Sequence, residues 1–271
     1  MKIAIMGTGM VGQALAGRLA ELGHDVTVGT RDTSATMAHT EPNPVGLPPF
    51  SAWSSAHPDV ALATFSDAAA GGELIINATA GSASLEVLRL AGVRHLAGKI
   101  LVDVANVLDF SHGMPPTLFV KDTDSLAEQI QREFPDAKVV KTLNTMTASL
   151  MVNPRQLVGG AHSTFISGDD TDAKDTVTAL LTELGHADII DLGGISTARG
   201  PEMLVKIWLE LWDALGTYEF GIKIVRLAQP RRDGWPDAHG RPGSPDYPVA
   251  TSMAIAHAQP IASWHTSKQR T

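Results

Sequence analysis

Three glycines near the start of the chain, Gly7, Gly9 and Gly12, have the spacing G-x-G-x-x-G within the stretch GTGMVG. In this spacing the first glycine permits a tight turn, and the second lets the backbone approach a phosphate group. The third lets the following helix pack close to its strand. The free N–H groups and the dipole at the start of that helix attract anions. We therefore predict that this segment binds the pyrophosphate of a dinucleotide.

A second group of candidate residues stands at the end of the next expected strand, in the sequence VGTRD. Sites for NAD place a carboxylate near this point to hold the ribose 2′-hydroxyl, whereas here Thr30 is uncharged and Arg31 follows. A guanidinium holds a phosphate through two parallel hydrogen bonds, and a threonine hydroxyl adds another. Thr30 and Arg31 therefore predict a site for the 2′-phosphate of NADP. The alternatives are that Asp32 pairs with Arg31, or that Arg31 is simply exposed.

The elements around these residues indicate half of a Rossmann fold. Residues 2–6 are an apolar run typical of a buried parallel strand, and 13–24 repeat apolar residues at helical spacing. Residues 25–30 are the second strand, so strand, glycine loop, helix and strand follow one another as this unit requires. Residues 33–58, rich in proline and small polar residues, predict a long surface loop or a broken helix.

Three further apolar runs, at 72–81, 98–106 and 138–148, are expected to supply strands of the same sheet. Ligands of a doubly wound sheet lie outside the carboxyl ends of its strands. That rule places the residues at these ends beside a cofactor or substrate: Asn77, Ala78, Ala80, Gly81, Asp103, Ala105, Asn106, Asn144 and Thr145.

The second half of the chain adds a smaller α/β portion and a tail. Residues 164–195 predict strand, helix and strand, and 198–217 predict a helix that is apolar on more than one side. We interpret that helix as a buried core helix; the alternatives are a dimer contact or a wall of the substrate cleft. We expect three parts: a Rossmann NADP-binding domain at 1–150, a substrate or dimerisation domain at 151–228, and an extended tail at 229–271, which Trp235 and Trp264 would anchor.

The composition limits the classes of function. A net charge of −8 without a long basic run makes nucleic acid an unexpected partner. The absence of cysteine excludes disulfides, cysteine-rich zinc sites and cysteine nucleophiles. The ten histidines show no metal-binding spacing and no G-x-S-x-G motif is present, so we expect neither a metal nor a hydrolase. Without a signal segment or an apolar span, we expect a cytoplasmic protein with no membrane partner.

Several motifs together carry a family resemblance: GTGMVGQALA, VTVGTRD, INATAG, VDVANVLDFSHGMPP, VVKTLNT and GTYEFGIKIV. In this order they resemble the NADPH-dependent coenzyme F420 oxidoreductases, above all their longer actinobacterial relatives. The resemblance runs over roughly residues 1–227 and implies hydride transfer between NADP(H) and a deazaflavin, coenzyme F420, as co-substrate.

The resemblance also assigns residues. It implies that Thr8, Gly9, Met10 and Val11 hold the phosphates, and that Thr30 and Arg31 contact the 2′-phosphate. Ala80, Ser84 and Ala148 match positions near the nicotinamide, and Phe220 matches a deazaflavin contact. The chain departs from the family pattern at Ala35, where a basic residue is expected, and at Ala80, where a bulky residue is expected.

Two other functions remain open at this stage. An NADPH-dependent reductase of a small imine, ketone or hydroxy acid would share the first domain and need a proton donor, for which His112 is the candidate; the simpler interpretation of His112 is a loop histidine. Lys141 is a candidate base, but we expect a solvated structural lysine at a strand edge. A non-catalytic NADP-binding sensor is the third function. We assign no catalytic residue under the hydride-transfer hypothesis, and we expect a homodimer.

Overall fold

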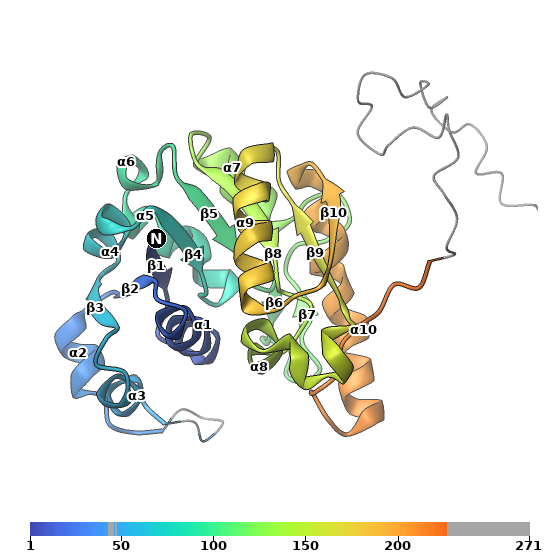
Figure 1. Cartoon of the computed structure of the whole chain (residues 1–271), viewed down its shortest axis with the longest axis horizontal. Coiled ribbons are helices and arrows are strands. Elements are labelled where there is room, and N and C mark those ends of the chain that lie inside the picture. The colour runs from blue at the N-terminus through green and yellow to red at the C-terminus, as the bar shows by residue number, and fades with distance from the viewer. Residues whose placement is uncertain (43–45, 47, 227–271) are drawn as a thin grey trace, which may run out of the picture. The chain divides into compact units, whose positions relative to one another are not determined.

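The computed structural model describes residues 1–42, 46 and 48–226, without the side chain of Val158. Within Met1–Arg226 the chain forms one compact unit, in which helices cover a central sheet (Figure 1). The predicted tail at 229–271, with Trp235 and Trp264, lies outside the described residues.

The described residues form one eight-stranded sheet in the order β10-β9-β8-β5-β4-β1-β2-β3. Its strands are β1 (Lys2–Met6), β2 (Asp25–Thr30), β3 (Ala61–Thr64), β4 (Leu74–Asn77), β5 (Ile100–Asp103), β8 (Lys138–Thr142), β9 (Ser163–Ser167) and β10 (Asp188–Gly193). Six neighbouring strands of this sheet, β3, β2, β1, β4, β5 and β8, are parallel to one another, whereas β9 runs antiparallel to β8. The chain places β2 and β3 on one side of β1 and then β4, β5 and β8 on the other side. The strand order therefore reverses between β1 and β4, which is where a doubly wound sheet binds its ligand.

Helices cover both faces of the sheet. One face carries α1 (Met10–Glu21), α3 (Phe50–Ala56), α8 (Ala148–Val152) and α9 (Thr171–Leu184). The other carries α4 (Phe65–Gly71), α5 (Ser84–Ala91), α6 (Val93–Leu96) and α7 (Leu126–Glu133). The remaining elements are α2 (Thr33–Ala38), α10 (Arg199–Leu215), a small hairpin of β6 (Leu108–Asp109) and β7 (Thr117–Leu118), and four 3₁₀ turns at Gly81–Ala83, Pro154–Gln156, Val158–Gly160 and Ile195–Ala198.

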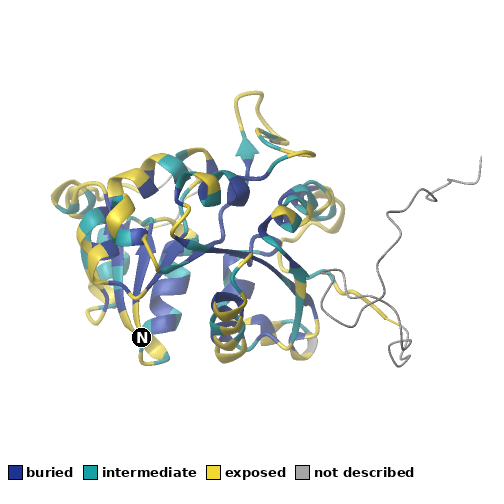
Figure 2. Cartoon of the chain, turned by 90° about the horizontal axis from the view of Figure 1, so that it is seen from above, coloured by how far each residue is buried: buried dark blue, intermediate teal, exposed yellow. Residues whose placement is uncertain are grey.

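The side-chain alternation along the strands explains the two layers. In β1, Ile3 and Ile5 belong to the core under α1, whereas Ala4 and Met6 belong to the core under α4 and α5. Both sets are almost fully buried, as residues of a strand covered on both faces must be (Figure 2). The short apolar run at 2–6 therefore indicated a central strand correctly.

The doubly wound fold and the predicted strands are confirmed. Two short helices, α2 and α3, lie within 33–58. The 164–195 stretch is strand, helix and strand, but β9 and β10 extend the main sheet rather than form a sheet of their own. The boundary at residue 150 stays a prediction.

The interpretation of 198–217 as a buried core helix was wrong. The buried residues of α10 are Pro201, Glu202, Val205 and Leu209, and none of its residues after Leu209 is buried. Towards its end Trp212 is 38% exposed and Leu215 is 56% exposed. The spacing of apolar residues along a helix predicts how wide its apolar face is. It does not predict whether other parts of the same chain cover that face.

Candidate functional site

The glycine loop has the geometry that a pyrophosphate needs. Gly7 has a φ of +120°, and a Cβ there would lie 2.8 Å from the carbonyl oxygen of Ala78. A Cβ on Gly12 would collide with the carbonyl oxygen of Gly7, so only glycine lets α1 start this close to β1. At Gly9, by contrast, no described atom lies within 4 Å of a built Cβ, which leaves the loop open on its outer side.

The start of α1 offers free donors to that open side. Gly9 is the N-cap of the helix, and among the described residues no side chain caps its first turn. The backbone N–H of Gln13 is already bonded to the Gly9 carbonyl, at 2.9 Å, so the free donors are those before it. The residues present therefore fit a bound pyrophosphate, which the N–H groups of Met10, Val11 and Gly12 would hold.

A cavity of about 580 Å³ opens beside this helix start, and we call it the outer cleft. Its described lining is Thr8, Gly9, Met10, Gln13, Thr30, Arg31, Asp32, Ala35, Thr36, His39, Glu41, Pro48, Pro49 and Phe50. Thr30 and Arg31 thus reach the same cleft as the glycine loop, as the sequence predicted for a 2′-phosphate site. Ala35 also lines it, so the missing basic side chain leaves room in the cleft.

Arg31 is paired, but not with Asp32. The Asp32 carboxylate caps α2, accepting a hydrogen bond from the N–H of Ala35 at 2.9 Å. Arg31 instead donates from Nη2 to Oε1 of Glu86 on α5, also at 2.9 Å. Both side chains of this pair are mostly exposed, at 67% and 61%, so solvent screens it and a phosphate can compete for the guanidinium.

A second cavity, of about 340 Å³, lies at the carboxyl ends of β4, β5 and β8, and we call it the apolar cavity. Its described lining is Met10, Val11, Ala78, Thr79, Ala80, Gly81, Ser82, Val104, Ala105, Asn106, Leu108, Phe110, Asn144, Met146, Thr147, Ala148, Met151, Val205, Trp208 and Leu209. Met10 lines both the apolar cavity and the outer cleft, so the two meet at the start of α1. Among the described lining residues no side chain is a carboxylate, an imidazole, an ammonium or a guanidinium.

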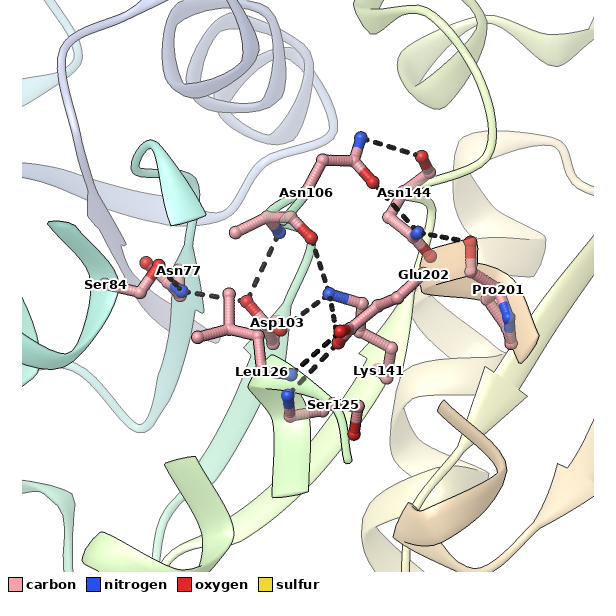
Figure 3. Close-up of polar contacts among 12 residues, drawn as sticks. Asn77, Ser84, Asp103, Asn106, Ser125, Leu126, Lys141, Asn144, Pro201 and Glu202 are labelled. Carbon is pink, nitrogen blue, oxygen red and sulfur yellow. Dashed lines mark hydrogen bonds and ion pairs between the residues drawn. The ribbon is translucent and has the colours of Figure 1, made fainter. Parts of the chain in front are cut away.

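A buried polar network lies at the ends of β4, β5 and β8 (Figure 3). Two of its three asparagines, Asn106 and Asn144, line the apolar cavity. Lys141, fully buried, donates to Asp103 Oδ2 at 2.7 Å and also to the carbonyl of Ala105, and its Nζ lies 3.2 Å from Glu202 Oε1. Burial would lower the pKa of Lys141, but the charges of Asp103 and Glu202 outweigh it and raise that pKa above its usual value. The expectation that Lys141 is solvated was therefore wrong, because both partners come from elements distant in sequence.

Glu202 connects α10 to the rest of the site. Its carboxylate accepts hydrogen bonds from the N–H groups of Leu126 and Ala127, at 2.8 and 3.1 Å, at the start of α7. Burial raises the pKa of Glu202, and Lys141 opposes that rise. One carboxylate thus fixes the start of α10 to both β8 and α7.

Two asparagines link the strand ends at the cavity itself. Asn106 Nδ2 donates to the carbonyl of Asn144 at 2.9 Å, and Asn144 Nδ2 donates to Asn106 Oδ1 at 3.1 Å and to the carbonyl of Pro201 at 2.9 Å. Deeper in, Asn77 Nδ2 donates to Asp103 Oδ1 at 2.8 Å and to Ser84 Oγ at 2.9 Å. This network fixes the wall of the apolar cavity without placing a charge in it.

The predicted site residues divide into three groups. Those lining the apolar cavity are Met10, Val11, Ala78, Ala80, Gly81, Ala105, Asn106, Asn144 and Ala148, and those lining the outer cleft are Thr8, Gly9, Met10, Thr30 and Arg31. Gly7 and Gly12 shape the loop, Asn77 and Ser84 are fully buried behind the wall, and Phe220 lies against Trp208 rather than on the cavity. Their roles toward a cofactor stay predictions.

Sequence reasoning missed several residues. Trp208, Val205 and Leu209 bring α10 to the apolar cavity, and only the cleft-wall alternative for 198–217 anticipated them. Glu86 and His39 carried no sequence signal. His112 is exposed between β6 and β7 and is not among the described residues that line either cavity.

The described residues contain neither a candidate metal site nor a candidate membrane-spanning helix. No group of three or more histidine, aspartate or glutamate side chains there has the arrangement of a metal site. No helix in the same residues combines the length and apolar character needed to cross a membrane.

The chain is similar to several known oxidoreductases. The model of the family described as "NADP oxidoreductase coenzyme F420-dependent" matches residues 2–107. A solved structure from Arthrobacter sp. FB24, assigned provisionally as an F420-dependent NADP-reductase, is 62% identical, with a TM-score of 0.81 over 83% of this chain and 100% of that chain.

Two curated relatives extend the comparison. The F420-dependent NADP reductase of Methanothermobacter marburgensis is 27% identical over 84% of this chain and 100% of its own length. The metalloreductase STEAP3 of Rattus norvegicus is 30% identical over 78% of this chain, but the chain spans only 38% of that protein's length. The chain therefore belongs to the family of coenzyme F420-dependent NADP oxidoreductases.

Proposed function

We propose that the protein transfers a hydride between NADP(H) and the deazaflavin coenzyme F420. One observation carries this proposal: the apolar cavity at the carboxyl ends of the strands has no ionisable side chain among its described lining residues. Hydride transfer between two bound heterocycles needs positioning and exclusion of water, and not a side-chain acid or base. Such a cavity suits hydride transfer better than it suits a reaction in which a side chain must protonate the substrate.

The outer cleft and the glycine loop support NADP as the dinucleotide. Arg31 and Thr30 would hold the 2′-phosphate, and the N–H groups at the start of α1 would hold the pyrophosphate. Met10 belongs to both cavities, so a dinucleotide bound this way passes from the outer cleft into the apolar cavity. When bound there, NADPH supplies the hydride.

The residues of the apolar cavity would orient the two rings. Ala78, Ala80 and Ala148 leave space for a flat ring to approach the backbone, and Asn106 and Asn144 offer amide groups at its edge. Met146, Met151 and Leu209 exclude water from that region. A proton needed on a ring nitrogen of the acceptor would come from solvent.

The main alternative is an NADPH-dependent reductase of a small imine, ketone or hydroxy acid. Such a reaction needs a proton donor at the substrate. His112 is exposed and absent from the described lining of the cavity, which disfavours it as that donor. Loss of turnover in His112→Ala with NADPH binding intact would support the alternative.

Two narrower proposals accompany this function, and one further alternative to it stays open. The exposed apolar end of α10 supports a homodimer, which an oligomeric-state measurement tests. A cytoplasmic location stays a prediction from the sequence. A non-catalytic NADP sensor would bind NADPH and change a protein partner without any turnover.

The test is a rapid mixing of protein, NADPH and oxidised F420, followed at the visible absorbance of the deazaflavin, with NADH in parallel. We expect the absorbance to bleach with NADPH and far more slowly with NADH. Equal bleaching with both would contradict the 2′-phosphate site. No bleaching, with NADPH tightly bound, would contradict F420 as the acceptor.

A further inference from the structure

Helix α10 brings one large aromatic side chain to the apolar cavity. Trp208 lines it together with Val205, which lies one turn earlier on the same face of the helix, and with Leu209. The start of this helix is fixed by Glu202, whose carboxylate is bonded to the start of α7 and lies 3.2 Å from Lys141 Nζ. The indole of Trp208 is therefore carried on an element that the buried network positions.

A second aromatic side chain supports Trp208 from outside the cavity. Phe220 stacks on it with ring centroids 5.3 Å apart and an interplanar angle of 26°. Phe220 is not among the described residues lining the cavity, so it lies in a second layer. In this arrangement Phe220 acts on the cavity through Trp208.

The segment after α10 is attached to β9, and this attachment holds Phe220 in place. The carbonyl of Ile222 accepts a hydrogen bond from the N–H of Ser163 at 2.8 Å, and the N–H of Ile224 donates to Ser163 Oγ at 2.9 Å. Gly221 passes so close to His162 that a Cβ there would lie 2.5 Å from the His162 Cβ. A glycine at 221 therefore lets the segment lie flat on β9.

The indole of Trp208 is held by packing alone. Its Nε1 is buried and has no hydrogen-bond partner among the described residues. Its ring packs against Phe220 and also lies near Trp212, with centroids 5.3 and 5.9 Å apart, so these aromatic neighbours set its orientation.

We propose that Trp208 is the surface on which the ring of the hydride acceptor stacks, with Phe220 as the positioning residue behind it. This rests on the proposed function and names the chemical class that the site favours: a planar, electron-poor heteroaromatic ring. An indole face offers stacking to such a ring, and offers much less to a small aliphatic imine or ketone. It also moves the acceptor contact from Phe220, where the family resemblance placed it, to Trp208.

The chain supplies a matched control on the same helix. Trp212 follows Trp208 by one turn, is 38% exposed and does not line the apolar cavity among the described residues. Trp208→Phe and Trp212→Phe make the same chemical change at the two positions. Trp208→Leu removes the aromatic face altogether and serves as the stronger variant.

The experiment measures KM for F420, kcat and the NADPH dissociation constant for each variant, and the quenching of tryptophan emission by F420. We expect Trp208→Leu to raise KM for F420 by about tenfold or more, the loss typical of one stacked ring, and Trp208→Phe by less. NADPH affinity should stay within about twofold in both. The quenched fraction should fall in Trp208→Phe and not in Trp212→Phe, a difference that a merely structural role would not produce.

For the second layer, Phe220→Leu should raise KM for F420, whereas Phe220→Tyr, which keeps an aromatic ring, should leave KM for F420 close to the wild-type value. If the wild-type protein reduces F420 and Trp208→Leu has an unchanged KM for F420, the stacking surface is overturned and the proposed function stands. Equal loss of NADPH and F420 binding would also overturn it, because that result means a general collapse of the cavity. Absence of F420 reduction by the wild-type protein would overturn the proposed function and the stacking surface together.

Discussion

Arg31 and Glu86, at the ends of two separate elements, form an ion pair at the outer cleft, with Nη2 2.9 Å from Oε1. The residue proposed to bind a phosphate thus already has an anionic partner, which comes from α5 and not from its own loop. A 2′-phosphate must compete with Glu86 for the guanidinium. Because the pair is exposed, that competition is weak but measurable.

Removal of the competing carboxylate should tighten NADPH binding. We expect Glu86→Gln to lower the NADPH dissociation constant by about two- to fivefold, the range of an exposed ion pair, with NADH binding unchanged. A fluorescence titration measures both constants. Glu133→Gln is the control, because Glu133 pairs with Arg89 of α5 and not with Arg31. A gain for NADH equal to that for NADPH would contradict the competition.

Removal of the guanidinium should abolish the preference for NADPH. We expect Arg31→Gln to weaken NADPH binding by roughly 10- to 100-fold, since hydrogen bonds to charged groups contribute about 1.5–3 kcal/mol, with little effect on NADH. The same titration measures it, and Arg89→Gln is the matched control. If Arg31→Gln keeps the wild-type ratio of NADPH to NADH affinity, another group binds the 2′-phosphate.

Lys141 should matter for stability because it lies between two buried carboxylates. We expect Lys141→Met to lower the free energy of unfolding by about 3–5 kcal/mol, since Asp103 and Glu202 would lose their cation. Denaturant unfolding measures the change. Lys138→Met is the control on the same strand, because the pair of Lys138 with Asp170 is partly exposed to solvent and should contribute less than about 1 kcal/mol. Equal effects of the two substitutions would exclude the buried network as the source of stability.

Stability should fall in mild acid because of His186. Burial lowers the pKa of His186 from 6.5 to about 4, and its ring hydrogen-bonds the hydroxyl of Thr164 and the carbonyl of Met151. The unfolded chain therefore binds a proton between pH 6.5 and about 4 that the folded chain does not bind. The stability from this residue is complete above pH 6.5 and is lost toward pH 4, at up to about 1.4 kcal/mol per pH unit.

Denaturant unfolding at a series of pH values between 7 and 4.5 tests this slope. We expect His186→Gln to have a lower free energy of unfolding at pH 7 and a flatter dependence on pH than the wild-type protein. A variant that keeps the wild-type slope would show that other groups cause it.

The sequence predicted the parts of the site that depend on local pattern. Gly7, Gly9 and Gly12 stand within one short loop, and Thr30 and Arg31 stand at the end of the next strand, so spacing alone located the glycine loop and one wall of the outer cleft. The strand ends at Asn77, Asn106 and Asn144 were found because parallel strands of one sheet end at the same edge.

The residues that the sequence did not predict depend on contacts between distant segments. Lys141 was expected in solvent because nothing near it in the chain signals Asp103 or Glu202 as partners. In the sequence, Trp208 and Trp212 belong to the same apolar stripe of the helix. Only the packing of α10 shows that Trp208 lines the apolar cavity whereas Trp212 does not. Glu86 has no motif of its own, and its effect on Arg31 follows from the packing of α5 beside the end of β2.

Direct hydride transfer from NADPH to F420 is the central claim, and an isotope experiment tests it most directly. Enzyme, oxidised F420 and NADPH deuterated at both C4 positions of the nicotinamide are mixed for a single turnover, and the reduced F420 is analysed by mass spectrometry. The proposed function predicts one deuterium in each reduced F420 molecule. Reduced F420 without deuterium, or no reduced F420 while NADPH is bound, would contradict it.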